Sequence, residues 1–229
     1  MKYEIILFDA DETLFDFKKT ERYALEKTFE HFAIPYEASY HLEIYGAINK
    51  KVWEDLEKGL ITPDRLKVER FKRLSEKLAL EFDPREFSDA YLQALGEGSF
   101  LLKGADKLVE ALSKDYRMGI LTNGLSVVQN NRIKQSVLKD YFEAVVISEE
   151  VKVAKPNAQI FDMILSQMGQ VDRTRVLMIG DSLTSDIQGG INAGIDTCWY
   201  NPHQVKNTTG IQPMYEVCDF EALRQWLEV

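Results

Sequence analysis

The sequence contains few of the residues on which several classes of protein depend. It has two cysteines, three histidines and no apolar stretch as long as a membrane span. Two cysteines, Cys198 and Cys218, are too few for a disulfide scaffold in 229 residues, and we expect both to be small buried side chains. The first apolar run, Ile5–Phe8, is too short for a signal sequence or a transmembrane helix. We therefore expect a cytoplasmic protein that does not bind a membrane.

Positive charge is also scarce. The chain has 28 lysines and arginines against 37 aspartates and glutamates, a formal net charge of −9. Repulsion between like charges then disfavours a nucleic acid polymer as partner. Neither G-x-G-x-x-G nor G-x-x-x-x-G-K-[ST] is present, which excludes the dinucleotide-binding and P-loop NTPase classes. His31, His41 and His203 lie in no motif and support neither a zinc site nor a histidine-based mechanism.

What the sequence does contain is the composition of a globular protein, with 45% hydrophobic and 28% charged residues. Short apolar runs typical of strands buried on both faces recur at Ile5–Phe8, Met118–Leu121, Val145–Ile147, Val176–Ile179 and, more weakly, Thr197–Tyr200. Between them lie helical patterns, such as Asn157–Met168 with Pro156 as its expected first residue and Gly169 beyond its end. Alternating strands and helices predict an α/β fold with a doubly wound parallel sheet.

One long segment breaks this alternation. From Asp16 to Gly98 there is helical periodicity but no strand-like run, and Thr62-Pro63 is a typical helix start. We therefore expect an α/β core formed by residues 1–15 and 99–229, and an inserted all-helical domain at 16–98. The sequence does not indicate an oligomeric state.

Polar residues follow the predicted strands at the points where these end. The residues concerned are Asp9 and Asp11 after the first run, Thr122 and Asn123 after the second, and Asp181 with Asp186 after the fourth. Ligands of open parallel sheets bind at this carboxyl edge, which Lys155 can also reach from the start of a helix. Clustered carboxylates repel one another, so such a site needs a divalent cation, a protonated member or both, and oxygen ligands of this kind favour Mg²⁺. With a lysine and a hydroxyl added, the arrangement suits a phosphoryl group that an ionised Asp9 could attack.

These motifs resemble those of a known superfamily. Asp9-x-Asp11-x-Thr13, Thr122-Asn123, Lys155-Pro156 and Gly180-Asp181 with Asp186 are similar, in order and in position, to the four motifs of the haloacid dehalogenase (HAD) superfamily. The similarity covers essentially the whole chain, because the helical insertion stands where that superfamily has its C1 cap. It implies a Rossmann-like core with a C1 cap.

The resemblance implies a role for each motif residue. Asp9 would be the nucleophile that forms an aspartyl-phosphate, and Asp11 the general acid and base. Thr122, the Asn123 backbone amide and Lys155 would bind the phosphoryl oxygens. Asp9, the Asp11 carbonyl and Asp181 would be the Mg²⁺ ligands, with Asp186 holding the water ligands of the metal or orienting Lys155.

The resemblance also distinguishes between reactions. Dehalogenases of the superfamily lack a carboxylate at the position of Asp11, so its presence here favours hydrolysis of phosphate esters. Residues 9–17, Ile48-Asn49, Arg70-Phe71 and 197–202 further resemble the noncanonical pyrimidine 5′-nucleotidases of the YjjG/YfnB type. The expected substrate is therefore a small phosphorylated metabolite, above all a nucleoside monophosphate. The alternatives are a phosphatase for sugar phosphates or phosphoglycolate, a phosphomutase, and a non-catalytic binding module.

Polar side chains on apolar helix faces are candidates for substrate recognition. Asn49 lies one turn from Tyr45 and Trp53, and Arg70 lies one turn from Leu66 and Leu74. A buried polar group without a partner costs roughly 1–3 kcal/mol, which a bound substrate would relieve. We therefore expect Asn49 and Arg70 to contact the substrate, with Phe17 or Trp53 as a stacking surface; a purely structural role for Arg70 and Trp53 is the alternative.

Overall fold

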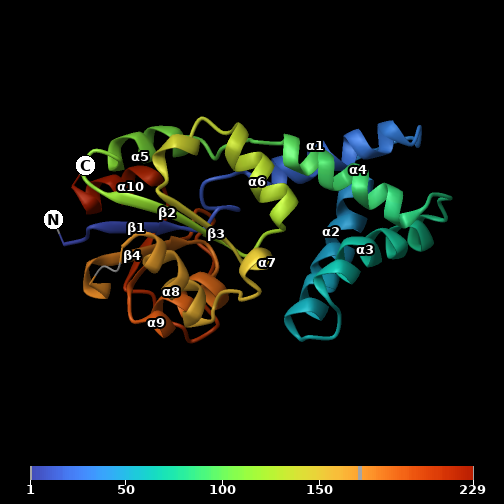
Figure 1. The fold of residues 1–229 in the computed structure, drawn as a ribbon. Helices are drawn as coiled ribbons and strands as arrows, with labels where there is room; N and C mark the ends of the chain where they lie inside the picture. Colours follow the sequence, from blue (N-terminus) through green and yellow to red (C-terminus); the bar gives the residue numbers. More distant parts are fainter. Residues whose placement is uncertain (1, 170–171, 229) are drawn as a thin grey trace. The chain divides into compact units, whose positions relative to one another are not determined.

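The computed structural model describes residues 2–169 and 172–228, which form two compact units (Figure 1). The first unit comprises the chain up to Phe17 and from Ser99 onward, and the second comprises Lys18–Gly98. No helix among the described residues has both the length and the apolar character that crossing a membrane requires.

The first unit is built on one parallel sheet with the strand order β3-β2-β1-β4-β5-β6. Its strands are β1 (Ile5–Phe8), β2 (Arg117–Thr122), β3 (Ala144–Ile147), β4 (Val176–Gly180), β5 (Asp196–Tyr200) and β6 (Tyr215–Val217). The first five match the apolar runs of the sequence within one residue at each end. The edge strand β6 was not predicted, because its three residues include an exposed glutamate and form no apolar run.

Helices cover both faces of this sheet (Figure 1). The helices of the first unit are α5 (Ala105–Leu112), α6 (Ser126–Gln135), α7 (Ser148–Val151), α8 (Ala158–Gln167), α9 (Gln188–Ala193) and α10 (Phe220–Leu227), with the short helical turns η1 (Lys139–Tyr141), η2 (Arg173–Arg175) and η3 (Leu183–Ile187). Ile6 and Phe8 of β1 belong to the core cluster that includes α5 and α10. Ile5 and Leu7 point the other way, into the cluster with α8. The predicted doubly wound α/β core is thereby confirmed.

Two details of the sequence reading were wrong. The helix expected to start at Pro156 begins at Ala158, because the Asn157 side chain accepts a hydrogen bond from Gln159 N at 2.9 Å and caps the helix. Cys198 is buried in β5, but Cys218 is exposed because it follows the short edge strand β6.

The second unit, whose backbone is described throughout, contains only helices: α1 (Phe17–His31, whose first residue belongs to the first unit), α2 (Ala38–Glu57), α3 (Pro63–Leu78) and α4 (Pro84–Glu97). Thr62 caps α3 by accepting a hydrogen bond from Arg65 N, and Asp83 caps α4 in the same way. The core is aromatic, with fully buried rings at Phe29, Tyr45, Phe71, Phe87 and Tyr91. Each helix thus buries one apolar face against the others.

Candidate active site

The order of the strands brings the motif residues together. β1 lies at the centre of the sheet, between β2 and β4, with Phe8 in register with Ile120 and Ile179. Asp9 follows β1 and donates its backbone N–H to the Ile179 carbonyl at 2.9 Å. Three neighbouring strands therefore end at one edge, where α/β proteins bind their ligands.

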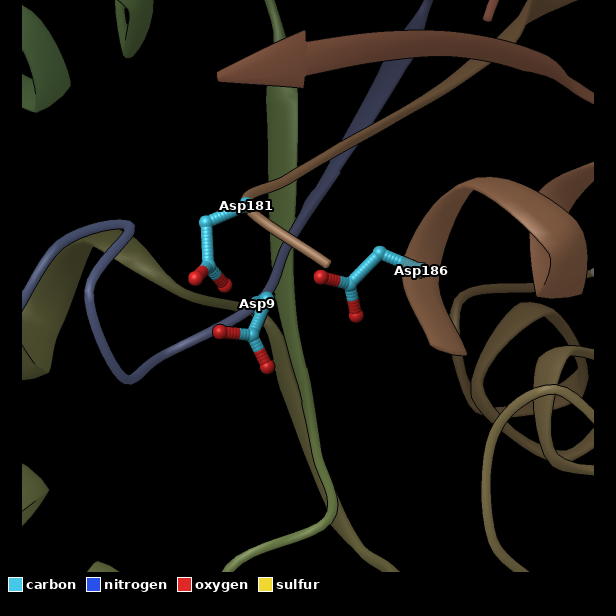
Figure 2. Close-up of side chains that lie close together, drawn as sticks. All are labelled: Asp9, Asp181 and Asp186. Carbon is cyan, nitrogen blue, oxygen red and sulfur yellow. The ribbon is translucent and has the colours of Figure 1, made fainter. Parts of the chain in front are cut away.

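Three carboxylates meet at this edge. Asp9, Asp181 and Asp186 each offer an oxygen, and these oxygens lie within 4.8 Å of one another (Figure 2). Asp9 and Asp186 are buried, at 7% and 1% exposure, and Asp181 is half-buried. Such a group of hard oxygen donors is the type of ligand set that Mg²⁺ prefers.

Lys155 is the cation at the centre of this cluster. Its Nζ atom lies 2.6 Å from Asp9 Oδ1 and 2.7 Å from Asp186 Oδ1, and it donates a further hydrogen bond to the Leu121 carbonyl at 2.6 Å. Burial by itself would lower the pKa of Lys155, but the charges of Asp186 and Asp9 outweigh burial and raise this pKa above its ordinary value. Lys155 is therefore a permanent positive charge.

One lysine does not neutralise three carboxylates. Burial raises the pKa of Asp9 and of Asp181 well above the ordinary range of an aspartate, and repulsion from neighbouring carboxylates raises it further against the attraction of Lys155. The site thus has an excess of negative charge that is relieved by protons or by a cation. The chemistry of these donors fits a divalent metal ion.

Asn123 and Thr122 shape the loop that follows β2. The Asn123 side chain donates to the Lys155 carbonyl and accepts from the Lys155 backbone N–H, both at 2.9 Å. Gly124 N donates to the Thr122 hydroxyl at 3.1 Å. The Asn123 amide therefore fixes the backbone from which Lys155 reaches the carboxylates.

The Asp186 carboxylate lies very close to the backbone at the end of β4. It lies in η3, and its Oδ2 atom accepts a hydrogen bond from Ser182 N at 2.9 Å. A Cβ atom on Gly180 would lie 2.3 Å from this same Oδ2, so no side chain fits there. Trp199 Nε1 donates to the Asp181 carbonyl at 2.7 Å and anchors the neighbouring residue.

Asp11 lies in a different environment from Asp9. Its carboxylate is 28% exposed and pairs with the Nη2 atom of Arg132, whose side chain is fully buried. Gln129 Nε2 donates to the other carboxylate oxygen, Asp11 Oδ2, at 2.7 Å. Sequence reasoning missed both α6 residues. Gln129 lies four residues before Ile133 and Arg132 four residues after Val128, so each shares a helix face with a buried apolar residue, but this spacing alone does not show that the two polar side chains are buried.

Of the predicted recognition residues, Asn49, Trp53 and Arg70 lie in the second unit, whereas Phe17 belongs to the first. Asn49 is 8% exposed and donates from Nδ2 to Glu21 Oε1 at 3.2 Å, while its Oδ1 atom is buried without a hydrogen-bond partner among the described residues. Arg70, 2% exposed, lies over the rings of Phe71 and Tyr91, and its Nη2 atom likewise lacks an acceptor there. Trp53 on α2 and Phe17 at the start of α1 are half-buried.

The fold and the strand-end cluster define a class of α/β enzymes with an acidic site at the carboxyl edge of a parallel sheet. Residues 6–200 match the family model of haloacid dehalogenase-like hydrolases, and the chain belongs to this family.

Similar proteins are known along the full length of the chain. It is 43% identical over 227 residues to the pyrimidine 5′-nucleotidase YjjG of Escherichia coli (99% of each chain), and 39% identical to the pyrimidine 5′-nucleotidase PynA of Streptococcus pneumoniae (100% of this chain, 96% of PynA). The crystal structure of the HAD-hydrolase YfnB of Bacillus subtilis, bound to magnesium, matches with a TM-score of 0.93 and 35% identity over all of both chains.

Gly180→Ala tests the close approach of Asp186. The added methyl group must displace the Asp186 carboxylate, and we expect overpacking to destabilise the protein by about 1–3 kcal/mol in urea unfolding. Gly46→Ala is the control, because a Cβ at Gly46 meets nothing within 4 Å. Equal stability of the two variants would contradict the inference that the position of Asp186 requires a glycine at residue 180.

The excess negative charge makes the effect of a metal depend on pH. Since the pKa of Asp9 and of Asp181 is raised in the folded state, the metal-free fold loses stability as pH rises above about 4, where the unfolded aspartates already ionise. A cation binds the ionised carboxylates and should reverse this loss. We expect Mg²⁺ to raise the melting temperature more at about pH 8 than at about pH 5, and an equal rise at both would contradict this account.

Proposed function

We propose that this protein is a Mg²⁺-dependent phosphomonoesterase that hydrolyses nucleoside 5′-monophosphates, with pyrimidine nucleotides as the preferred substrates. The observation that carries the proposal is the buried Asp9 carboxylate at 2.6 Å from Lys155, beside Asp181 and Asp186. Similarity to two proteins named pyrimidine 5′-nucleotidases supports the choice of substrate. We also propose that the reaction takes place in the cytoplasm, as expected from the sequence.

The metal site in this proposal consists of the Asp9 and Asp181 carboxylates and the Asp11 carbonyl, with Asp186 beside them. Bound there, Mg²⁺ would offset the negative charge of the carboxylates and of the substrate phosphate. Lys155 supplies the second positive charge, and Thr122 with the Asn123 backbone N–H binds phosphoryl oxygens.

The proposed reaction has two steps. An Asp9 carboxylate oxygen attacks phosphorus, the bond from phosphorus to the nucleoside oxygen breaks, and Asp11 gives its proton to that oxygen. Water then attacks the aspartyl-phosphate, Asp11 takes the proton from the water, and inorganic phosphate leaves with Asp9 restored. Each residue ends as it began, so atoms and charges balance over the cycle.

We further propose that Asn49 and Arg70 recognise the nucleoside. One acceptor, Asn49 Oδ1, and one donor, Arg70 Nη2, are buried without partners among the described residues. The imide edge of uracil has an N–H group for which Asn49 Oδ1 is an acceptor and carbonyl groups for which Arg70 Nη2 is a donor. Phe17 or Trp53 would provide an aromatic surface for the base.

A panel of phosphate esters tests the proposed function. We expect the highest kcat/KM for pyrimidine nucleoside monophosphates, lower values for sugar phosphates and phosphoglycolate, and loss of turnover when EDTA removes the metal. Asp9→Asn should reduce the rate by about 10⁴-fold or more, because an amide is not a nucleophile for phosphorus. No turnover of any ester by the Mg²⁺-loaded wild-type protein would instead favour a binding module.

Substitutions in the second unit test recognition of the nucleoside. Asn49→Ala and Arg70→Ala should each lower kcat/KM for uridine monophosphate by about 10- to 100-fold, as expected for one lost hydrogen bond to a buried group. Hydrolysis of a generic aryl phosphate should change by less than about threefold, because that substrate has no base to bind. The exposed Lys50→Ala is the control on the same helix as Asn49. Equal losses on both substrates would count against recognition of the base.

A further inference from the structure

The roles proposed so far do not explain why Asp11 is paired with two side chains of α6. Arg132 Nη2 and Gln129 Nε2 bind the two different oxygens of the Asp11 carboxylate, and Gln129 Oε1 also accepts from Arg132 Nη2 at 2.9 Å. The three side chains therefore form a closed set of contacts. Each of the two donors restricts a different oxygen, so rotation of the carboxylate breaks at least one bond.

The two donors are themselves held rigidly. Arg132 has a fully buried side chain and lies over the Phe15 ring, 4.7 Å from its centroid. Gln129 is 1% exposed. The Asp11 carboxylate is the most exposed member of the set, at 28%. The orientation of Asp11 is thus determined by α6 rather than by its own loop.

The surrounding backbone accommodates this arrangement. A Cβ on Gly124 would lie 2.2 Å from Gln129 Nε2, so the loop after β2 needs a glycine for Gln129 to reach Asp11. Phe15, whose ring lies beneath Arg132, forms an isolated β-bridge with Asp11 across the turn that follows β1. The loop after β2 and the turn after β1 therefore both shape the surroundings of Asp11 and its two partners.

Stability alone does not account for Arg132. Its Nε and Nη1 atoms are buried without hydrogen-bond partners among the described residues. Burial of an incompletely bonded guanidinium is unfavourable, and an apolar side chain would pack there at lower cost. The contact with Asp11 is what the guanidinium provides and an apolar residue cannot.

We infer that Arg132 and Gln129 are positioning residues that hold the Asp11 carboxylate in the orientation needed for proton transfer. This inference rests on the proposed function, in which Asp11 protonates the leaving oxygen. A proton donor must lie within hydrogen-bond reach of that oxygen, about 2.6–3.2 Å, so an Asp11 free to rotate is a poorer acid. Neither α6 residue needs to touch the substrate.

The inference predicts a dependence on the leaving group. The value of kcat/KM reports the steps up to departure of the leaving group, so it depends on Asp11 only when that group is basic enough to need a proton. Arg132→Met should lower kcat/KM by about 10- to 100-fold for uridine monophosphate and by less than about threefold for dinitrophenyl phosphate. The value of kcat should fall with both esters wherever hydrolysis of the aspartyl-phosphate limits turnover, because Asp11 also activates the water.

The experiment measures kcat and kcat/KM over a series of aryl phosphates of graded leaving-group acidity and over uridine monophosphate. Arg132→Met, Arg132→Lys and Gln129→Leu are compared with Asp11→Asn, and the exposed Asn131→Ala is the matched control on α6. We expect the loss in kcat/KM to grow with leaving-group basicity in the Asp11 and α6 variants, with Arg132→Lys intermediate, and no change for Asn131→Ala. Gln129→Leu supplies the test if Arg132→Met does not fold.

The outcomes separate the inference from the proposed function. If the α6 variants lose kcat/KM equally for all esters, or gain activity, positioning of Asp11 is refuted while phosphatase activity stands. If the wild-type protein hydrolyses none of the esters, the proposed function fails and the inference fails with it.

Discussion

A single buried ammonium group among three carboxylates is the interaction on which the rest of the site depends. Lys155 contacts Asp9 and Asp186 directly, and Asp181 lies beside them. These residues come from segments far apart in the sequence, so without Lys155 the fold would concentrate unpaired negative charge at the carboxyl edge of its sheet. Breaking a buried ion pair is strongly destabilising, so the contacts of Lys155 help to hold the strand ends together. Because one lysine does not balance three carboxylates, the site still lacks positive charge.

The remaining parts of the core unit serve to bring charged groups close enough for this interaction. The Asn123 amide fixes the backbone of Lys155 through two hydrogen bonds. Gly180 lets Asp186 lie against β4 without a side chain in between. The helix N-terminus that follows Lys155 begins only at Ala158, which leaves the lysine on a loop that can turn into the site. The site is thus built from backbone geometry as much as from side-chain chemistry.

Much of this could be predicted from the sequence, because the relevant signals are local. An apolar run followed directly by Asp9 or by Asp181 indicates a buried strand and the residue at its carboxyl end, and parallel pairing then brings these ends to one edge. The contacts of Asp11 could not be predicted in this way. Arg132 is 121 positions away from Asp11 in the chain, and on a helix with Asn130, Asn131 and Lys134 around it a buried arginine is not distinguishable from an exposed one. The edge strand β6 was missed for a related reason, since it gains its stability from pairing with β5 rather than from its own residues.

Asp9 and Asp11 are two residues apart, yet the fold gives each a different kind of cation. In the proposed reaction Asp9 is the nucleophile and must keep an oxygen accessible to phosphorus. The compact ammonium of Lys155 binds Asp9 Oδ1 and leaves the other oxygen of that carboxylate free of the lysine. Asp11 is the proton carrier of the proposed reaction and needs a defined orientation, and a planar guanidinium with an adjacent amide restricts both of its oxygens. Exchange of the two cations would therefore impair both proposed roles, because an arginine fork would occupy both oxygens of Asp9 and a lysine would leave Asp11 free to rotate. The different roles proposed for Asp9 and Asp11 are thus consistent with the geometry of the cations that pair with them.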